Sequence, residues 1–191
     1  EEWNSSKSLS WQLLENEDNR QLNQYIKDIN HFYMEQRPLW EIDFEWQGFE
    51  WLVPDDNHNN VVVFLRKDKD DNQLLCAINF SPNTYEDYRF GCPPVKEFVE
   101  VFNSDDASYG GTGVKNTEPC KVSWKPSHGK ESSVSIRIPP LGAVFMVGQG
   151  KLRPKPQRKK AADPEKAGTA KKASAKTTKT AKGDKSAKRT S

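Results

Sequence analysis

The hydrophobic pattern of this chain changes its period at Pro38, and this change constrains the fold more than any other feature. Before Pro38, apolar side chains recur at the spacing of one face of an α-helix, which predicts a helix from about residue 19 to residue 36. Asp18 or Asn16 can cap its first free N–H groups, and proline ends it because proline lacks an N–H and clashes with the preceding turn. The expected stripe consists of Leu22, Ile26, Ile29 and Tyr33, widened by Tyr25 and Phe32.

After Pro38 the sequence shows period-two alternation or short apolar runs separated by turn residues, a pattern typical of an antiparallel β-sandwich. In one run Val134, Ile136 and Ile138 point to one face, and the intervening polar residues point to the other. About 110 residues of such strands can close a core of their own. The expected strands are 61–66, 74–80, 88–90, 98–102, 120–124, 133–138 and 143–147.

Charge and aromatic residues divide the chain into two unlike parts. Residues 151–191 hold 15 Lys and Arg against 3 acidic residues, a charge of 15 − 3 = +12, whereas the whole chain carries only +2. Every Trp, Tyr and Phe lies before this tail. A segment without large apolar side chains cannot offset its ordering entropy, so the basic tail is expected to be disordered.

Several classes of site are disfavoured by the residue types and their spacing. Cys76, Cys92 and Cys120 are widely spaced and odd in number, which argues against a disulfide framework or a zinc ribbon and suits a reducing cytoplasm. No histidine spacing suggests a metal, and we expect neither metal nor cofactor. An apolar run of 18 residues is also missing, so no membrane partner is expected.

Carboxylates occur in adjacent pairs, among them Asp55/Asp56, Asp70/Asp71 and Asp105/Asp106. Retaining glycoside chemistry needs an acid and a nucleophile roughly 5 Å apart across a sugar bond. Adjacent acids on a strand point to opposite faces, and adjacent acids in a loop are usually solvated. None of these pairs is therefore assigned as a catalytic dyad.

Tryptophan offers a flat apolar face with a polar N–H at its edge, which suits stacking on a sugar ring. Trp3 and Trp11 lie in the polar N-terminal segment and are the candidates for such platforms. Trp46, Trp51 and Trp124 suit a core or an interface equally well.

A Gly-rich stretch, 102–113, connects two of the expected strands and contains Tyr109-Gly110-Gly111. It is no phosphate loop, because Gly113 is not followed by Lys and Ser or Thr. Together with Asn79-Phe80-Ser81-Pro82 and the segment 138–143, in this order, it resembles the C-terminal domain of 1,4-α-glucan branching enzymes. These enzymes are amylase-like glycosidases and transglycosidases of glycogen synthesis.

The resemblance extends to the N-terminal segment, where Glu2-Trp3-Asn4 and Ser8–Leu14 resemble the stretch after the last barrel strand of that family. It implies three regions: 1–38 as the end of an (α/β)₈ barrel including its last helix, 39–149 as the amylase-type C-terminal sandwich, and 150–191 as the tail. Because the first residue is Glu1, the chain is expected to begin inside a longer one.

The implied parent transfers α-1,4-glucan chains through a retaining glycosyl-enzyme and forms α-1,6 branches in glycogen, in the cytoplasm. Its catalytic carboxylates lie at the ends of earlier barrel strands, so no catalytic residue is expected in this chain, which should be inactive alone. Trp3, Asn4 and Trp11 are the candidate glucan contacts. The expected partners are α-1,4-glucan or glycogen and the barrel domain.

Alternatives stay open at this point. The sandwich could be a non-catalytic glucan-binding or structural module, or the end of a related debranching or trehalose-releasing enzyme, although the Tyr109-Gly110-Gly111 loop favours branching. The basic tail could bind polyanions such as DNA weakly and in a salt-dependent manner. A solvated tail, or one resting on the acidic domain, fits its composition better, because no aromatic residue or recognition helix accompanies the charge.

Overall fold

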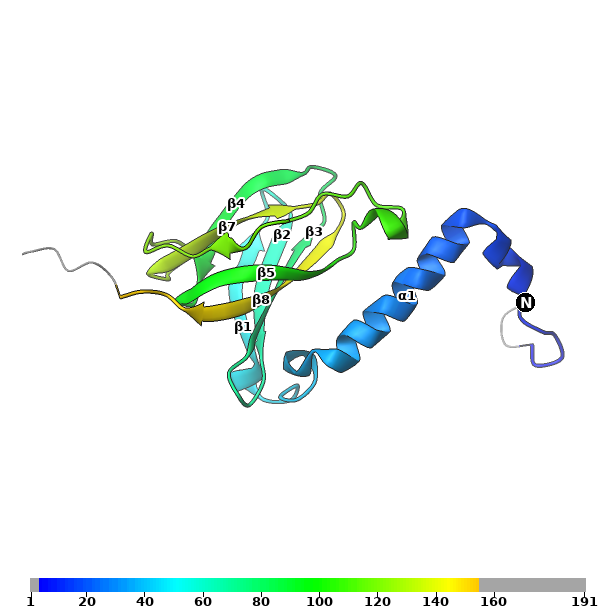
Figure 1. Cartoon of the computed structure of the whole chain (residues 1–191), viewed down its shortest axis with the longest axis horizontal. Helices are drawn as coiled ribbons and strands as arrows, with labels where there is room; N and C mark the ends of the chain where they lie inside the picture. The colour runs from blue at the N-terminus through cyan, green and yellow to red at the C-terminus, as the bar shows by residue number, and fades with distance from the viewer. Residues whose placement is uncertain (1–3, 155–191) are drawn as a thin grey trace, which may run out of the picture. The chain divides into compact units, whose positions relative to one another are not determined.

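The structure, a computed structural model, describes residues 4–154, which belong to one compact unit. A short 3₁₀ turn and one long helix precede eight strands (Figure 1). Two further 3₁₀ turns lie between the helix and the first strand, and another lies between the fifth and sixth strands. The elements are η1 (Trp11–Glu15), α1 (Glu17–Glu35), η2 (Arg37–Leu39), η3 (Trp46–Gly48), β1 (Phe49–Asp56), β2 (Val61–Lys67), β3 (Gln73–Asn79), β4 (Tyr85–Cys92), β5 (Val95–Asn103), η4 (Ala107–Tyr109), β6 (Cys120–Lys121), β7 (Ser132–Ile138) and β8 (Ala143–Lys151).

Helix α1 confirms the expected helix to within two residues at either end. Asn16, one of the two predicted caps, accepts a hydrogen bond from the backbone N–H of Asn19 at 3.3 Å. The chain leaves the helix after Glu35, and Pro38 is buried in the following turn η2. The change of period at this proline therefore marks a real boundary between helix and strands.

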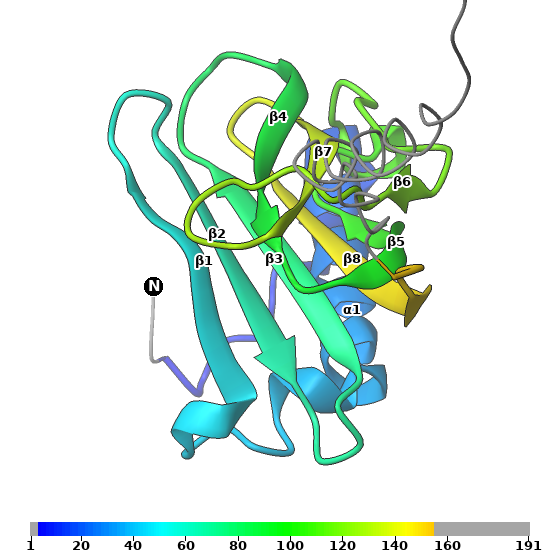
Figure 2. The ribbon, with the colours of Figure 1, turned by 90° about the vertical axis from the view of Figure 1, so that its left-hand side faces the viewer.

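The strands form two antiparallel sheets, as the alternation predicted. The larger sheet has the order β1-β2-β3-β8-β5-β6, and β4 pairs with β7 in the smaller one. A bridge between Ser123 and Ser133 joins the segment after β6 to β7, so this edge connects the two sheets. Helix α1 and the smaller sheet lie on opposite sides of the larger sheet (Figures 1 and 2).

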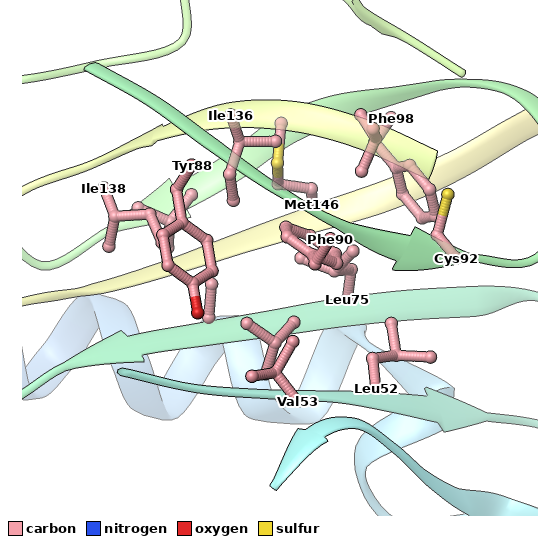
Figure 3. Packing of buried hydrophobic residues seen from close by; sticks show 14 of the residues in the cluster. Leu52, Val53, Leu75, Tyr88, Phe90, Cys92, Phe98, Ile136, Ile138 and Met146 are labelled. Carbon is pink, nitrogen blue, oxygen red and sulfur yellow. The ribbon is translucent and has the colours of Figure 1, made fainter. Parts of the chain in front are cut away.

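The main core fills the space between the sheets (Figure 3). Phe90 from β4 and Phe98 from β5 are completely buried there, together with Leu75 and Met146. The expected face of β7 is confirmed, because its three aliphatic residues at 134, 136 and 138 are all buried. Fully burying one such side chain contributes about 1.5–3 kcal/mol, so this interior accounts for most of the stability of the sandwich.

A second cluster holds α1 on the outer face of the larger sheet. Phe32 is the buried residue of the helix, and its ring stacks on Phe102 at 4.9 Å and meets Phe145 edge-on at 5.2 Å between ring centroids. Leu22 on the expected stripe is 59% exposed, and Ile26 and Tyr33 are about half exposed. The prediction that the helix presents an uncovered apolar patch is confirmed.

Several strand predictions need correction. Strand β1 was missed because Pro54, Asp55 and Asp56 interrupt its alternation, although it pairs with β2 through two register shifts. The strand expected over 120–124 shrinks to Cys120–Lys121, since the chain bonds to β5 only as far as Val122 and bridges to β7 at Ser123. Three strands are longer than expected: β4 is Tyr85–Cys92 instead of 88–90, β5 is Val95–Asn103 instead of 98–102, and β8 is Ala143–Lys151 instead of 143–147. The tail was expected to be disordered from about residue 150, and this start is wrong, because β8 continues to Lys151 and Leu152 packs against the main core. The rest of the predicted tail lies outside the described residues.

Candidate functional site

Three motifs that are far apart in the sequence meet at one end of the sandwich, here named the motif end. The side-chain amide of Asn79 donates to the carbonyl oxygen of Pro139 at 2.8 Å, and its backbone N–H donates to that of Gly142 at 2.9 Å. Two hydrogen bonds join Ser104 and Ala143. The backbone N–H of Ser104 donates to the carbonyl oxygen of Ala143 at 3.0 Å, and the backbone N–H of Ala143 donates to the hydroxyl oxygen of Ser104 at 2.8 Å. The motifs concerned are 79–82, 102–113 and 138–143.

The Gly-rich loop is organised around the buried carboxylate of Asp105. Its oxygens accept hydrogen bonds from the N–H and hydroxyl of Thr112, at 2.8 and 2.6 Å, and from the N–H of Val114 at 3.0 Å. Burial alone would disfavour the charge, but these donors together keep the pKa of Asp105 below its usual value. The carboxylate therefore closes the loop and is not available for acid–base chemistry.

Two glycines give this loop its path. Gly110 follows η4 with a φ of +83°, a conformation that favours glycine. At Gly111 a Cβ atom would lie 2.3 Å from the carbonyl oxygen of Asp105, closer than any side chain tolerates. The Gly-Gly pair is thus required by backbone geometry, as the sequence suggested for glycines in turns.

The loop also fastens helix α1 to the sandwich, and Figure 1 shows it reaching from the end of β5 toward the helix. The hydroxyl of Tyr109 donates to Asp28 of α1 at 2.9 Å. Its ring meets Tyr25 edge-on at 5.3 Å and stacks on Phe102 at 6.0 Å. Burial and the bond to Asp28 raise the pKa of Tyr109 to about 12, so the phenol stays a donor at neutral pH. We call this arrangement the tyrosine clip.

Carboxylates of the other adjacent pairs also form hydrogen bonds or ion pairs within the fold. Asp106 caps η4 by accepting from Ser108 at 2.9 Å and pairs with Lys115. Asp56 accepts from the hydroxyl of Tyr88 at 2.6 Å, and Asp70 pairs with Arg37 at 2.8 Å. Within residues 4–154 no three His, Cys, Asp or Glu side chains lie close enough together to hold a metal ion. No helix in the described part has both the length and the apolar character needed to cross a membrane.

The three predicted glucan contacts lie in the segment before α1. Trp3 falls outside the described residues. Asn4 is exposed, and its side chain accepts from the N–H of Ser6 at 3.0 Å, which shapes the turn that follows it. Trp11 opens η1 and is 65% exposed, so its ring is available to a ligand.

The sequence left the roles of the later tryptophans open, and the structure places two of them at the surface. Trp51 is half exposed on the outer face of β1 and contacts Phe49 and Phe64 at ring-centroid distances of 4.9 and 5.8 Å. Trp46, which shortly precedes these residues in the sequence, is also exposed. The i, i+2 spacing of Phe49 and Trp51 was the signal in the sequence that could have identified this aromatic surface.

Two packed antiparallel sheets, with the motifs gathered at one end and a helix on the outer face, define an all-β sandwich domain. Residues 51–149, more than half of the chain, match the family described as "Alpha amylase, C-terminal all-beta domain". The chain therefore belongs to this family. This confirms the expected fold and the resemblance to amylase-like enzymes.

Two curated relatives carry the name "1,4-alpha-glucan branching enzyme GlgB". The protein from Halothermothrix orenii is 40% identical over 145 residues, which cover 75% of this chain and 23% of that protein. The protein from Desulfitobacterium hafniense is 38% identical over 146 residues, covering 76% and 23%. The chain thus spans about a quarter of the length of these relatives.

Proposed function

We propose that this chain is the C-terminal part of a 1,4-α-glucan branching enzyme. The observation that carries the proposal is the identity of about 40% with branching enzymes over three quarters of the chain. The meeting of the three motifs at one end of the sandwich adds support, because the residues on which the resemblance rests form one connected structure. A reducing cytoplasm fits the three cysteines, all of which are free.

The reaction of such an enzyme breaks an α-1,4 bond, holds the glucan chain as a glycosyl-enzyme and passes it to a 6-hydroxyl group. This requires two carboxyl groups roughly 5 Å apart that are free to act as acid and nucleophile. Asp105 and Asp106 are occupied by backbone and lysine partners in the loop that they shape. The catalytic carboxylates are accordingly assigned to a barrel outside this sequence, and the chain alone is expected to be inactive.

Helix α1 is proposed to be the last helix of that barrel, with 1–38 as the barrel end, 39–149 as the sandwich and 150–191 as the tail. One side of α1 packs on the sandwich through Tyr25 and Phe32, while Leu22, Ile26 and Tyr33 remain exposed. A helix that is apolar on two sides needs a second partner to bury the remaining surface. A barrel is the partner that the family assignment supplies. Alone, the chain is expected to associate through this patch.

The sandwich is proposed to brace the barrel, and Trp3, Asn4 and Trp11 are proposed to contact the glucan. The exposure of Trp11 supports this, since an accessible indole face can stack on a sugar ring. Replacing Trp11 by Ala should lower the affinity of the chain for glycogen, measured by affinity electrophoresis. The equally exposed Leu13 lies in the same 3₁₀ turn, and a Leu13→Ala variant provides the control.

A chimera tests the branching assignment. The C-terminal region of the Halothermothrix orenii enzyme is replaced by this chain, and branching of amylose is followed by the fall in absorbance of its iodine complex. We expect the chimera to be active, while the enzyme lacking that region and this chain alone are both inactive. A soluble, folded chimera without activity would contradict the proposal.

A second candidate function is a glucan-binding module that works without a barrel. The half-exposed Trp51 favours it, because its ring is held in place by the partly buried Phe49 and Phe64. Tight binding of glycogen by this chain alone, lost in a Trp51→Ala variant, would support the module.

For the tail, weak polyanion binding is proposed from its +12 charge over residues 151–191. Comparing DNA retention with and without these residues at two salt concentrations tests it, because such binding should fall steeply with salt.

A further inference from the structure

A cleft of about 460 Å³ opens between the first two turns of α1 and the tip of the Gly-rich loop. Its size falls within the range of about 300–1,000 Å³ that is usual for small-ligand sites. None of the roles described above for the motif end uses this space. The residues that matter for its chemistry are Asp18, Gln21, Tyr25, Tyr109 and Gly110.

Two polar side chains in the cleft are available to a ligand. Neither the carboxylate of Asp18 nor the side-chain amide of Gln21 forms a hydrogen bond with another side chain or backbone group of residues 4–154. Gln24, three positions after Gln21 on the same helix, differs from Gln21 because its side-chain amide donates to Asp28 at 2.8 Å. The cleft therefore offers a charged acceptor and an amide that can both donate and accept.

The aromatic wall of the cleft is fixed in place by the tyrosine clip. The rings of Tyr25 and Tyr109 meet at 5.3 Å and 69°, and the bond of the Tyr109 hydroxyl to Asp28 holds the second ring. Gly110 keeps the space beside the amide open, since a Cβ atom there would lie 2.7 Å from Oε1 of Gln21. Such a prearranged site loses little conformational freedom when a ligand binds.

The chemistry of the lining selects among ligand classes. None of the lining residues is cationic, which disfavours phosphates and other anions, and one carboxylate is too few to hold a metal ion. Hydroxyl groups of a sugar can bond to a carboxylate and an amide, and the apolar face of a sugar ring can pack on the tyrosine rings. From this lining we infer that the cleft is a subsite for glucosyl units of an α-glucan. The choice of α-glucan among neutral sugars rests on the proposed function.

The subsite is tested by titrating the full, isotopically labelled chain with maltoheptaose and following its NMR spectrum. We expect the largest shifts at the side-chain amide of Gln21 and the backbone N–H of Gly110. A Gln21→Ala variant should bind about five- to tenfold more weakly, because it loses the hydrogen bonds of one amide. Asn30→Ala, an exposed position on the same helix, should leave the affinity unchanged. Circular dichroism verifies that both variants keep their fold.

Three other outcomes of the titration would overturn the proposal that the cleft is a glucan subsite. Shifts confined to residues 4–11, or equal affinities for Gln21→Ala and the unaltered chain, would place the glucan contact elsewhere. The absence of any response to maltoheptaose would also exclude it. The branching assignment is judged separately by the chimera: an active chimera without a cleft response defeats the subsite alone, and an inactive chimera with a cleft response defeats the branching assignment alone.

Discussion

The interior of the sandwich and the contact that holds α1 differ in how completely they are closed. In the interior, both sheets contribute buried side chains, and Phe90, Phe98 and Leu75 have no exposed surface. Against the outer face, one buried helix residue, Phe32, is assisted by the tyrosine clip, and other apolar residues of α1 stay exposed. The sandwich thus has a closed core of its own, while the helix is attached through a few contacts that single substitutions can remove.

The largest expected effect comes from the interior. Phe90→Ala should lower the free energy of unfolding by about 3–5 kcal/mol, because it leaves a cavity that the two sheets cannot fill. Urea unfolding followed by tryptophan fluorescence measures this loss. The fully exposed Phe44 is the matched control, and Phe44→Ala should change stability by less than about 0.5 kcal/mol. Equal effects of the two substitutions would contradict the packing described here.

Phe32→Ala should release the helix and leave the sandwich folded. We expect a loss of about 3 kcal/mol in the stability of the helix contact, at the lower end of the range for buried phenylalanine. Hydrogen exchange should then become faster in α1 and stay slow in β2, β3 and β8. Tyr33→Ala, at the neighbouring half-exposed position, should leave exchange unchanged. Faster exchange throughout the sheets would show that helix and sandwich unfold together.

Asp105→Asn should loosen the Gly-rich loop and reduce stability by about 2 kcal/mol, since a charged acceptor of several hydrogen bonds is lost. The pKa of Asp105 is lowered in the folded state, so its contribution is complete above the unfolded value of about 3.9 and is lost as the pH falls below it. Stability measured between neutral pH and pH 3 should therefore fall less steeply in the variant. A parallel pH dependence of variant and unaltered chain would exclude this role.

Tyr109→Phe gives the smallest effect and concerns the clip alone. Removing the hydroxyl should cost about 1 kcal/mol and speed hydrogen exchange in α1 near Asp28. Tyr85→Phe removes a comparable bond, to the carbonyl oxygen of Asn59 at 2.8 Å, on a different loop. Tyr85→Phe should leave hydrogen exchange in α1 unchanged. This control distinguishes the loss of the clip from the loss of any one hydrogen bond.

Much of the fold followed from local patterns. The helical spacing that starts near Asn19 and the proline at 38 fixed the helix, and the alternation around Ile136 fixed both a strand and its buried face. Strand β1 did not follow, because Pro54 and two aspartates conceal a strand that is held by its partner β2. For the site, Trp11 could be identified as an accessible aromatic residue, whereas the cleft beside Gln21 could not.

The sequence alone determined where the helix and most strands lie, because periodicity and proline act locally, and its ordered motifs pointed to the family. Only the tertiary structure decided that α1 packs through Tyr25 and Phe32 instead of the longer stripe through Leu22 and Ile26. It also decided that the three motifs meet, and that Tyr109 reaches Asp28 across 81 positions of the chain. Such contacts depend on how separate segments are brought together, and no local pattern encodes that.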